Sequence, residues 1–274
     1  MGLDVRCWGV RGSIPSPGGH TSRYGGNTPC VEMRCGDERM IFDLGTGARA
    51  LGEENAGAVM NAHVFMTHYH YDHLQGLPFF TPVFDPRSQF VIRGPTRNGK
   101  TVKDVIVGQM QQPYFPVTVE MVFRAKIEYL PFTQGDRCTV GEATVTALEV
   151  NHPGGTLAYR VDYRGRAVVF ATDHEHGKLD QELAEFSRGA DVILYDAMYS
   201  DDEYRGAGGS PKIGWGHSTW QSAVALADTA GIKQLVLFHH DPTRSDAALD
   251  AVVKQVRKLR PEAIAAREGT WLKL

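Results

Sequence analysis

The chain has 274 residues, a formal net charge of -3 at pH 7 and 42% hydrophobic residues, a composition typical of a globular protein with a substantial core. This charge provides no broad basic field, which excludes long duplex nucleic acid as an obligatory partner but leaves small phosphorylated ligands open. The first residues lack the apolar core of a secretory signal, and no apolar run reaches membrane-spanning length. We therefore expect a cytoplasmic protein with no membrane partner.

The N-terminal segment 9–26 is rich in Gly and Pro and is predicted to form a long loop over a functional site. Arg11 and Ser13 within this loop, or Arg23 and Asn27 near its end, are candidates for substrate contact, because such groups bind anionic oxygens. Turn formation explains the same residues equally well.

A hairpin is predicted after this loop. Strand-like runs at 30–35 and 40–42 flank a Gly-Asp turn and lead into Asp43-Leu44-Gly45. The four cysteines of the chain are scattered, without any CxxC pair that would indicate a zinc-thiolate site. We expect them to be buried free thiols.

The segment 66–76, MTHYHYDHLQG, places three histidines and an aspartate in six consecutive positions after an apolar run. On a helix His68 and His70 would point to nearly opposite sides, whereas on an extended chain they share a face. We therefore predict a strand that runs into a loop, with the following turn directing Asp72 and His73 elsewhere. This arrangement suits two neighbouring metal ions, and imidazole and carboxylate are ligands of zinc, manganese and iron. A histidine-rich surface loop is the less favoured alternative.

Later predicted strands also end in polar groups. The strand 143–150 leads to His152, the hairpin 157–171 leads to Asp173, the strand 191–194 leads to Asp196, and the strand 234–238 leads to His239 and His240. Because α/β folds assemble sites at the carboxyl ends of strands, these groups are predicted to converge.

Helices are predicted between the strands from apolar residues at helical spacing. They cover 103–112, 179–186, 219–230 with Ser218 as N-cap, and an apolar stripe from Leu249 to Leu259 that Pro261 ends. Two runs of strands with helices between them indicate a layered α/β architecture, two sheets packed together with helices outside. We interpret residues 1–274 as one domain.

The ligand-type residues, in this order, resemble those of the metallo-β-lactamase superfamily over nearly the whole chain. The resemblance implies a four-layer αββα sandwich with a two-metal centre between the sheet edges. It also implies a ligand set: His68, His70 and His152 for one metal; Asp72, His73 and His239 for the other; and Asp173 as the bridge. Zinc is the first expectation for the two divalent ions, with manganese or iron as alternatives.

Within that superfamily, Gly216-His217-Ser218-Thr219 followed by a helix and by Leu237-Phe238-His239 resembles the phosphodiesterase branch, and PYFPV at 113–117 fits it too. This branch includes ribonuclease Z and the cyclic-phosphate phosphodiesterases. Bacterial ribonuclease Z enzymes carry a long tRNA-gripping arm between the equivalents of His152 and Asp173, which here lie only 21 positions apart. The resemblance therefore favours hydrolysis of a small phosphodiester, a cyclic nucleotide or other cyclic phosphate, by attack of a metal-bridging hydroxide.

Two residues receive catalytic roles in this interpretation. Asp72 would accept a hydrogen bond from the hydroxide, and His217 would bind a phosphoryl oxygen or protonate the leaving alkoxide. His239 is preferred over His240 as the ligand, His174 and His176 are expected to be exposed loop residues, and Asp196 either orients a ligand histidine or caps backbone amides.

Other functions stay open at this point. They are an RNA-processing nuclease of the ribonuclease Z kind, a hydrolase of a lactam or thioester, and a non-catalytic metal or ligand sensor. A homodimer is also left open, because the sequence does not settle the oligomeric state.

Overall fold

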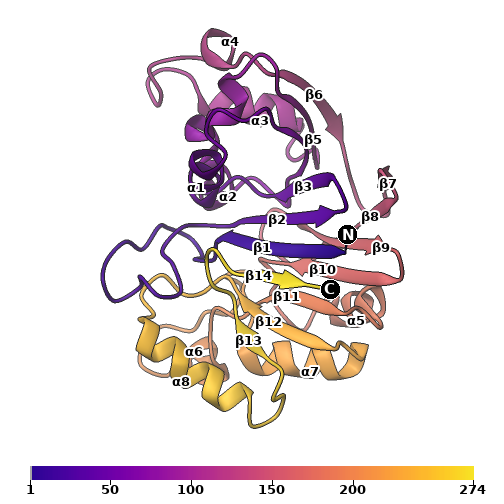
Figure 1. Cartoon of the computed structure of the whole chain (residues 1–274). Coiled ribbons are helices and arrows are strands. Elements are labelled where there is room, and N and C mark those ends of the chain that lie inside the picture. The colour runs from indigo at the N-terminus through magenta and orange to yellow at the C-terminus, as the bar shows by residue number, and fades with distance from the viewer. Residues whose placement is uncertain (1) are drawn as a thin grey trace.

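A computed structural model describes residues 2–274 (Figure 1). Two seven-stranded mixed sheets form the centre of the molecule, in the orders β14-β1-β2-β3-β4-β5-β6 and β13-β12-β11-β10-β9-β8-β7. The strands of the first sheet are β1 (Leu3–Gly9), β2 (Cys30–Cys35), β3 (Glu38–Phe42), β4 (Asn61–Phe65), β5 (Gln89–Gly94), β6 (Lys126–Pro131) and β14 (Trp271–Lys273). Those of the second are β7 (Arg137–Val140), β8 (Ala143–Val150), β9 (Thr156–Tyr163), β10 (Arg166–Ala171), β11 (Val192–Asp196), β12 (Gln234–Phe238) and β13 (Ile264–Ala265).

The direction of the strands determines which strand ends lie at the same edge of the two sheets. In the first sheet β3, β4, β5 and β6 are parallel, and in the second β10, β11, β12 and β13 are parallel. The carboxyl ends of β3, β4, β10, β11 and β12 lead into Asp43, the histidine motif, Asp173, Asp196 and His239. This order is the physical basis for the predicted convergence.

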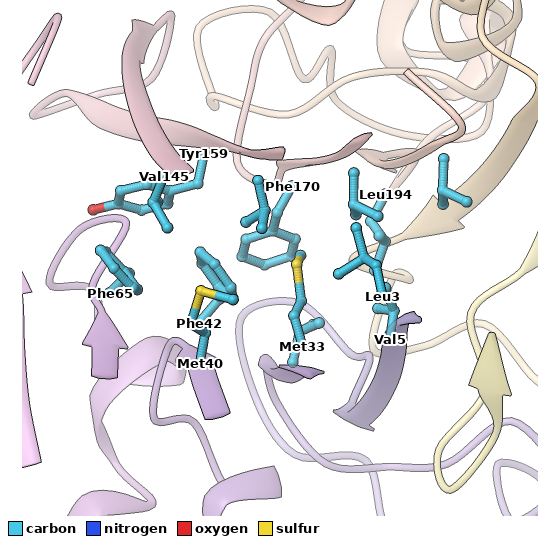
Figure 2. Close-up of a cluster of buried hydrophobic side chains, with 14 of the residues drawn as sticks. Leu3, Val5, Met33, Met40, Phe42, Phe65, Val145, Tyr159, Phe170 and Leu194 are labelled. Carbon is cyan, nitrogen blue, oxygen red and sulfur yellow. The ribbon is translucent and has the colours of Figure 1, made fainter. Parts of the chain in front are cut away.

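The two sheets pack face to face over a core of aliphatic and aromatic side chains. In Figure 2, Phe42 and Phe65 from the first sheet face Tyr159 and Phe170 from the second. The Phe42 and Phe65 rings stack with centroids 5.3 Å apart, and the Tyr159 hydroxyl donates a hydrogen bond of 2.7 Å to the Met66 carbonyl. The core therefore reaches the start of the histidine motif and fixes its backbone.

Helices cover both outer faces (Figure 1). One outer core lies under the first group of helices and the other under the second. The first group comprises α1 (Gly47–Glu54), α2 (Tyr71–Leu74), η1 (Leu77–Phe79), η2 (Thr81–Phe84), α3 (Val102–Gln109) and α4 (Val119–Val122), and the second α5 (Asp180–Ser187), α6 (Asp201–Arg205), α7 (Trp220–Ala230) and α8 (Asp246–Val256). The predicted αββα sandwich is confirmed.

Burial explains why the strand patterns differ. Strand β11, VILYD, is buried at all five positions because both faces of the sheet are covered there, so it reads as a continuous apolar run. Strand β8 alternates between buried and partly exposed residues. Within residues 2–274, no helix has the length and apolar character needed to cross a membrane.

Some boundaries differ from the sequence prediction. The N-cap of α7 is Thr219 rather than Ser218, because the Thr219 hydroxyl accepts the Ser222 amide. Helix α8 ends at Val256, so Leu259 lies beyond it and is 64% exposed instead of extending the apolar stripe. Strands β1, β5, β6, β7, β13 and β14 and helix α1 are additional elements.

Candidate metal centre

The histidine motif combines a loop with a single helical turn. Strand β4 ends at Phe65, the chain continues as a loop, and α2 begins at Tyr71 with His70 as its extended N-cap residue. His68 and His70 therefore project from the loop, while Asp72 and His73 project from the helical turn. The motif is divided into two pairs as predicted, although the strand ends at Phe65, before the motif, and the turn is helical.

The structure gathers the predicted ligands into two groups that share Asp173. His68, His70 and His152 lie with Asp173 in one group, and Asp72, His73 and His239 lie with it in the other. In each group the potential ligand atoms lie within 4.8 Å of one another. The two oxygens of Asp173 face different groups, Oδ1 lying 3.1 Å from His73 Nε2 and Oδ2 3.7 Å from His68 Nε2.

Hydrogen bonds on the outer side fix the tautomers of three of these histidines. His73 Nδ1 donates to Asp43 at 2.8 Å, and His152 Nδ1 donates to the Gly216 carbonyl at 2.8 Å. The Thr67 hydroxyl gives its only proton to Asp43, so it accepts from His68 Nδ1 at 3.0 Å. In the neutral form of each of these three rings, Nε2 is therefore the nitrogen that presents a lone pair inward.

The inner atoms fit divalent cations. Nε2 of His68 and Nε2 of His73 are buried without a hydrogen-bond partner, and the latter lies 3.2 Å from an oxygen of Asp72. His152 Nε2 and His70 Nδ1 lie 3.1 Å apart. Lone pairs so close to one another and to carboxylates repel unless a positive charge lies between them, and the donor set is one that zinc accepts.

The pKa shifts follow from the same arrangement. Burial lowers the pKa of His68 well below its usual value, and burial lowers the pKa of His152 to about 4. Burial also opposes protonation of His73, but the carboxylates of Asp173, Asp72 and Asp43 outweigh it and raise the pKa of that ring. These carboxylates thus attract positive charge to the position that a cation would take.

His217 lies beside the two groups and is oriented by Asp196. Its Nδ1 donates to Asp196 at 2.8 Å, and its ring stacks on His239 with centroids 4.9 Å apart. Burial opposes its protonation, yet the Asp196 carboxylate raises the pKa of His217 to about 9. Asp196 thus orients His217, which is not one of the predicted ligand histidines, and its other oxygen accepts from the Met198 amide at 3.1 Å. Within residues 2–274, we find no hydrogen-bond partner for His217 Nε2, which leaves that atom available to substrate.

The two adjacent histidines that follow β12 have different partners. His239 Nε2 lies 3.2 Å from Asp173 and 3.3 Å from Asp72, whereas His240 Nε2 donates to the Ala266 carbonyl on the other side. His240 is buried. His174 is also buried, with Nε2 2.7 Å from Asp180, so its expected exposure is wrong.

The residues of the N-terminal loop that were predicted to contact substrate differ in burial and in their hydrogen-bond partners. The expectation for Arg11 is wrong, because its side chain is fully buried and donates to the carbonyls of Gly25, Asp241 and Arg244. The Asn27 side-chain amide donates to Glu268. The Ser13 amide donates to Asp72 at 2.8 Å, which brings this residue to the centre. The substrate contacts of Ser13 and Asn27 stay predictions. Arg23 pairs with Asp250 on the surface.

Three residues outside the predicted set also shape the centre. Asp43 and Thr67 form the buried hydrogen-bonded support of His73 and His68. Glu175 accepts from the amides of Gly214 and Gly216 and so holds the loop that leads to His217. The sequence signal that could have found one of them is a carboxylate directly after a predicted strand, as at Asp43.

Comparison with known proteins agrees with this geometry. Residues 41–240 match the family model of the beta-lactamase superfamily domain. A relative named ribonuclease Z from Pyrococcus furiosus is 24% identical, over 88% of this chain and 89% of its own. The metallo-beta-lactamase fold protein YhfI from Bacillus subtilis has a TM-score of 0.73 and 20% identity, with 99% of both chains covered. A diphosphatase of the PhnP family has a TM-score of 0.74 and 17% identity, with 99% of this chain and 98% of the other covered. Since the family model covers well over half of its length, the chain belongs to the metallo-β-lactamase superfamily.

Proposed function

We propose that the chain is a dinuclear-metal-dependent phosphodiesterase that hydrolyses a small phosphodiester, a cyclic nucleotide or another cyclic phosphate. The observation that carries the proposal is the pair of histidine and aspartate groups that share Asp173, with the His217–Asp196 pair beside them. The ribonuclease Z relative and the diphosphatase neighbour support it, because both names describe enzymes that act on phosphate esters or anhydrides.

The chain's own residues supply positioning and proton transfer. Two bound divalent ions, with zinc as the first candidate, would neutralise phosphate charge and generate a nucleophile from water at neutral pH. His68, His70 and His152 would hold one ion and Asp72, His73 and His239 the other, with Asp173 shared. Asp196 fixes the His217 ring so that Nε2 can bind a phosphoryl oxygen or give a proton to the leaving oxygen. The Ser13 amide holds the Asp72 carboxylate in place.

A second candidate is RNA processing of the ribonuclease Z kind, which the curated relatives favour. Two observations favour the small substrate over it. Between His152 and Asp173 the chain forms only the β9–β10 hairpin, with Arg164 and Gly165 in the turn. The alignment with the Pyrococcus furiosus relative spans 293 positions, more than the 274 residues of this chain, so that relative carries insertions that are missing here.

The test is a metal analysis of the purified protein followed by hydrolysis of a substrate panel. The panel contains cyclic nucleotides, bis(p-nitrophenyl) phosphate, structured RNA, nitrocefin and S-lactoylglutathione. We expect turnover of a cyclic nucleotide, lost in Asp173→Ala and His217→Ala and retained in His20→Ala, which changes an exposed histidine of the N-terminal loop. Preferred cleavage of RNA would support the second candidate. A metal-loaded protein inert toward every phosphodiester would contradict the proposal and favour a sensor.

A further inference from the structure

The loop between α6 and α7 has an unusual combination of a fixed backbone and an exposed aromatic residue. Residues 206–216 contain five glycines, a composition that favours mobility. The buried Glu175 carboxylate nevertheless accepts from the Gly214 amide at 2.6 Å, the Gly216 amide at 2.8 Å and the Tyr204 hydroxyl at 2.5 Å. These three bonds hold the end of the loop in one place.

The same loop touches the candidate metal centre directly. The Gly216 carbonyl accepts from His152 Nδ1 at 2.8 Å, and a side chain at position 216 would overlap the His152 ring. Trp215 therefore lies one residue from a contact with His152 and two residues before His217. Its backbone cannot move away from the centre without breaking the hydrogen bonds of Glu175 and His152.

The side chains at this end of the loop are exposed although they are large and apolar. Trp215 is 54% exposed and Ile213 is 64% exposed, while the Lys212 ammonium lies 4.1 Å from the centroid of the Trp215 ring. Exposed tryptophan contributes little to folding but offers a rigid stacking surface to a ligand. The ammonium adds positive charge at the same point, which suits an anionic ligand.

Two other segments carry an exposed apolar residue close in the chain to a residue of the centre. Tyr71 is 80% exposed and lies between His70 and Asp72, and Ile14 is 59% exposed and follows Ser13, whose amide contacts Asp72. Each is adjacent in the chain to a residue of the centre. Three separate segments of the chain thus carry an exposed apolar residue next to a residue of the centre or of its hydrogen-bonded surroundings.

We propose that Trp215 is a stacking subsite for the planar heterocycle of the substrate, with the positive charge of Lys212 beside the ring. The inference rests on the proposed phosphodiesterase function and specifies its substrate class: a phosphodiester that carries a nucleobase, in preference to one without a base. Stacking accepts any base, because every base has a π-face. Selectivity for a nucleotide over a base-free diester then arises at Trp215, outside the polar centre.

The test compares cyclic AMP with a base-free cyclic phosphodiester, glycerol 1,2-cyclic phosphate, in wild type and three variants. For Trp215→Ala we expect KM for cyclic AMP to rise about 5- to 150-fold, far more than KM for the base-free diester, with kcat changed much less. Trp215→Phe keeps an aromatic face and should recover most of the loss. Leu259→Ala removes an equally exposed apolar side chain beyond α8 and should behave as wild type.

Equal rises of KM for both diesters, or no rise for either, would overturn the subsite. A change from dimer to monomer in Trp215→Ala, seen by sedimentation with KM unaltered, would show that the loop contacts a second copy instead. If wild type hydrolyses neither diester, the proposed function fails, and titration with AMP decides on the subsite. Saturable quenching of tryptophan fluorescence that Trp215→Ala abolishes would then support it, and its absence would refute it.

Discussion

Asp43 is the residue whose replacement tests the metal centre most directly without removing a ligand. Its buried carboxylate accepts from the Thr67 amide at 2.8 Å, from the Thr67 hydroxyl at 2.8 Å and from His73 Nδ1 at 2.8 Å. All three partners are donors. In Asp43→Asn one acceptor oxygen becomes an NH₂ group, so at least one of these donors must face another donor whichever way the amide is turned.

The expected result is weaker metal binding in a folded protein. If the NH₂ group faces His73, that ring must move its proton to Nε2, which then cannot bind a cation; if it faces Thr67, the support of His68 is lost. Loss of such an outer partner typically lowers metal affinity 10- to 100-fold, about 1.4 to 2.8 kcal/mol. The affinity is measured by zinc competition with a chromogenic chelator, and the fold by circular dichroism.

Glu32→Gln is the matched control. Glu32 is an equally buried carboxylate that accepts from Trp8 Nε1 at 3.0 Å and pairs with Arg34 and Arg39, on strand β2 away from the centre. We expect this variant to lose stability while its zinc affinity stays at the wild-type value. The reasoning is refuted if Asp43→Asn folds normally and binds zinc as tightly as wild type, or if Glu32→Gln weakens zinc binding equally.

Asp196→Asn should lower kcat about 10²- to 10⁴-fold with metal content unchanged, because its short hydrogen bond to a side chain is the one to His217; loss of metal in this variant would instead make Asp196 a support of His239, whose Nδ1 lies 3.9 Å from it. Arg11→Met should lower the free energy of unfolding by about 3 kcal/mol or more in urea titrations, since it leaves three carbonyls without their buried donor; a loss below about 1 kcal/mol would contradict this. In a thiol-reagent assay of the native protein at pH 8, Cys138 should react first, because the other three cysteines are buried and burial raises their pKa values, and all four should react in denaturant. If a thiol of the native Cys138→Ser variant still reacts fast, the N-terminal strands that carry the other three cysteines open readily.

The αββα architecture could be predicted because strand patterns and ligand order are local properties. Strands β2, β8 and β12 have the predicted bounds, since alternation or an apolar run bounded by turn residues is sufficient there. Strand β1 carries no such boundary on its N-terminal side, and β14 is only three residues long. Their places depend on pairing across the whole chain, Arg6 opposite Trp271, and no local pattern encodes that.

The convergence of the candidate ligands could be predicted, whereas the residues that support them could not. Imidazole and carboxylate groups at strand ends announce metal chemistry by their type, so His68, Asp173 and His239 stand out. The groups that orient them depend on contacts between distant segments, such as Glu175 with Gly216, and their chemistry fits turns and caps just as well. Arg11 illustrates the opposite error, since a buried arginine that holds loop carbonyls looks the same in sequence as one that binds phosphate.

Several residues at the candidate metal centre have a positive backbone φ, which could not be predicted from the sequence. Ser13, Asp43, Asp173 and His239 have φ values of 63°, 61°, 50° and 57°, the left-handed region that favours glycine. They make up four of the seven non-glycine residues with positive φ among residues 2–274. Each conformation costs about 1 kcal/mol, so glycine would be favoured at every one of these positions if folding alone decided. Three of the four carry a side chain that faces the candidate metals or holds their ligands, and the fourth donates its amide to Asp72. The strained positions therefore coincide with the candidate metal centre, and they single out these residues independently of any motif.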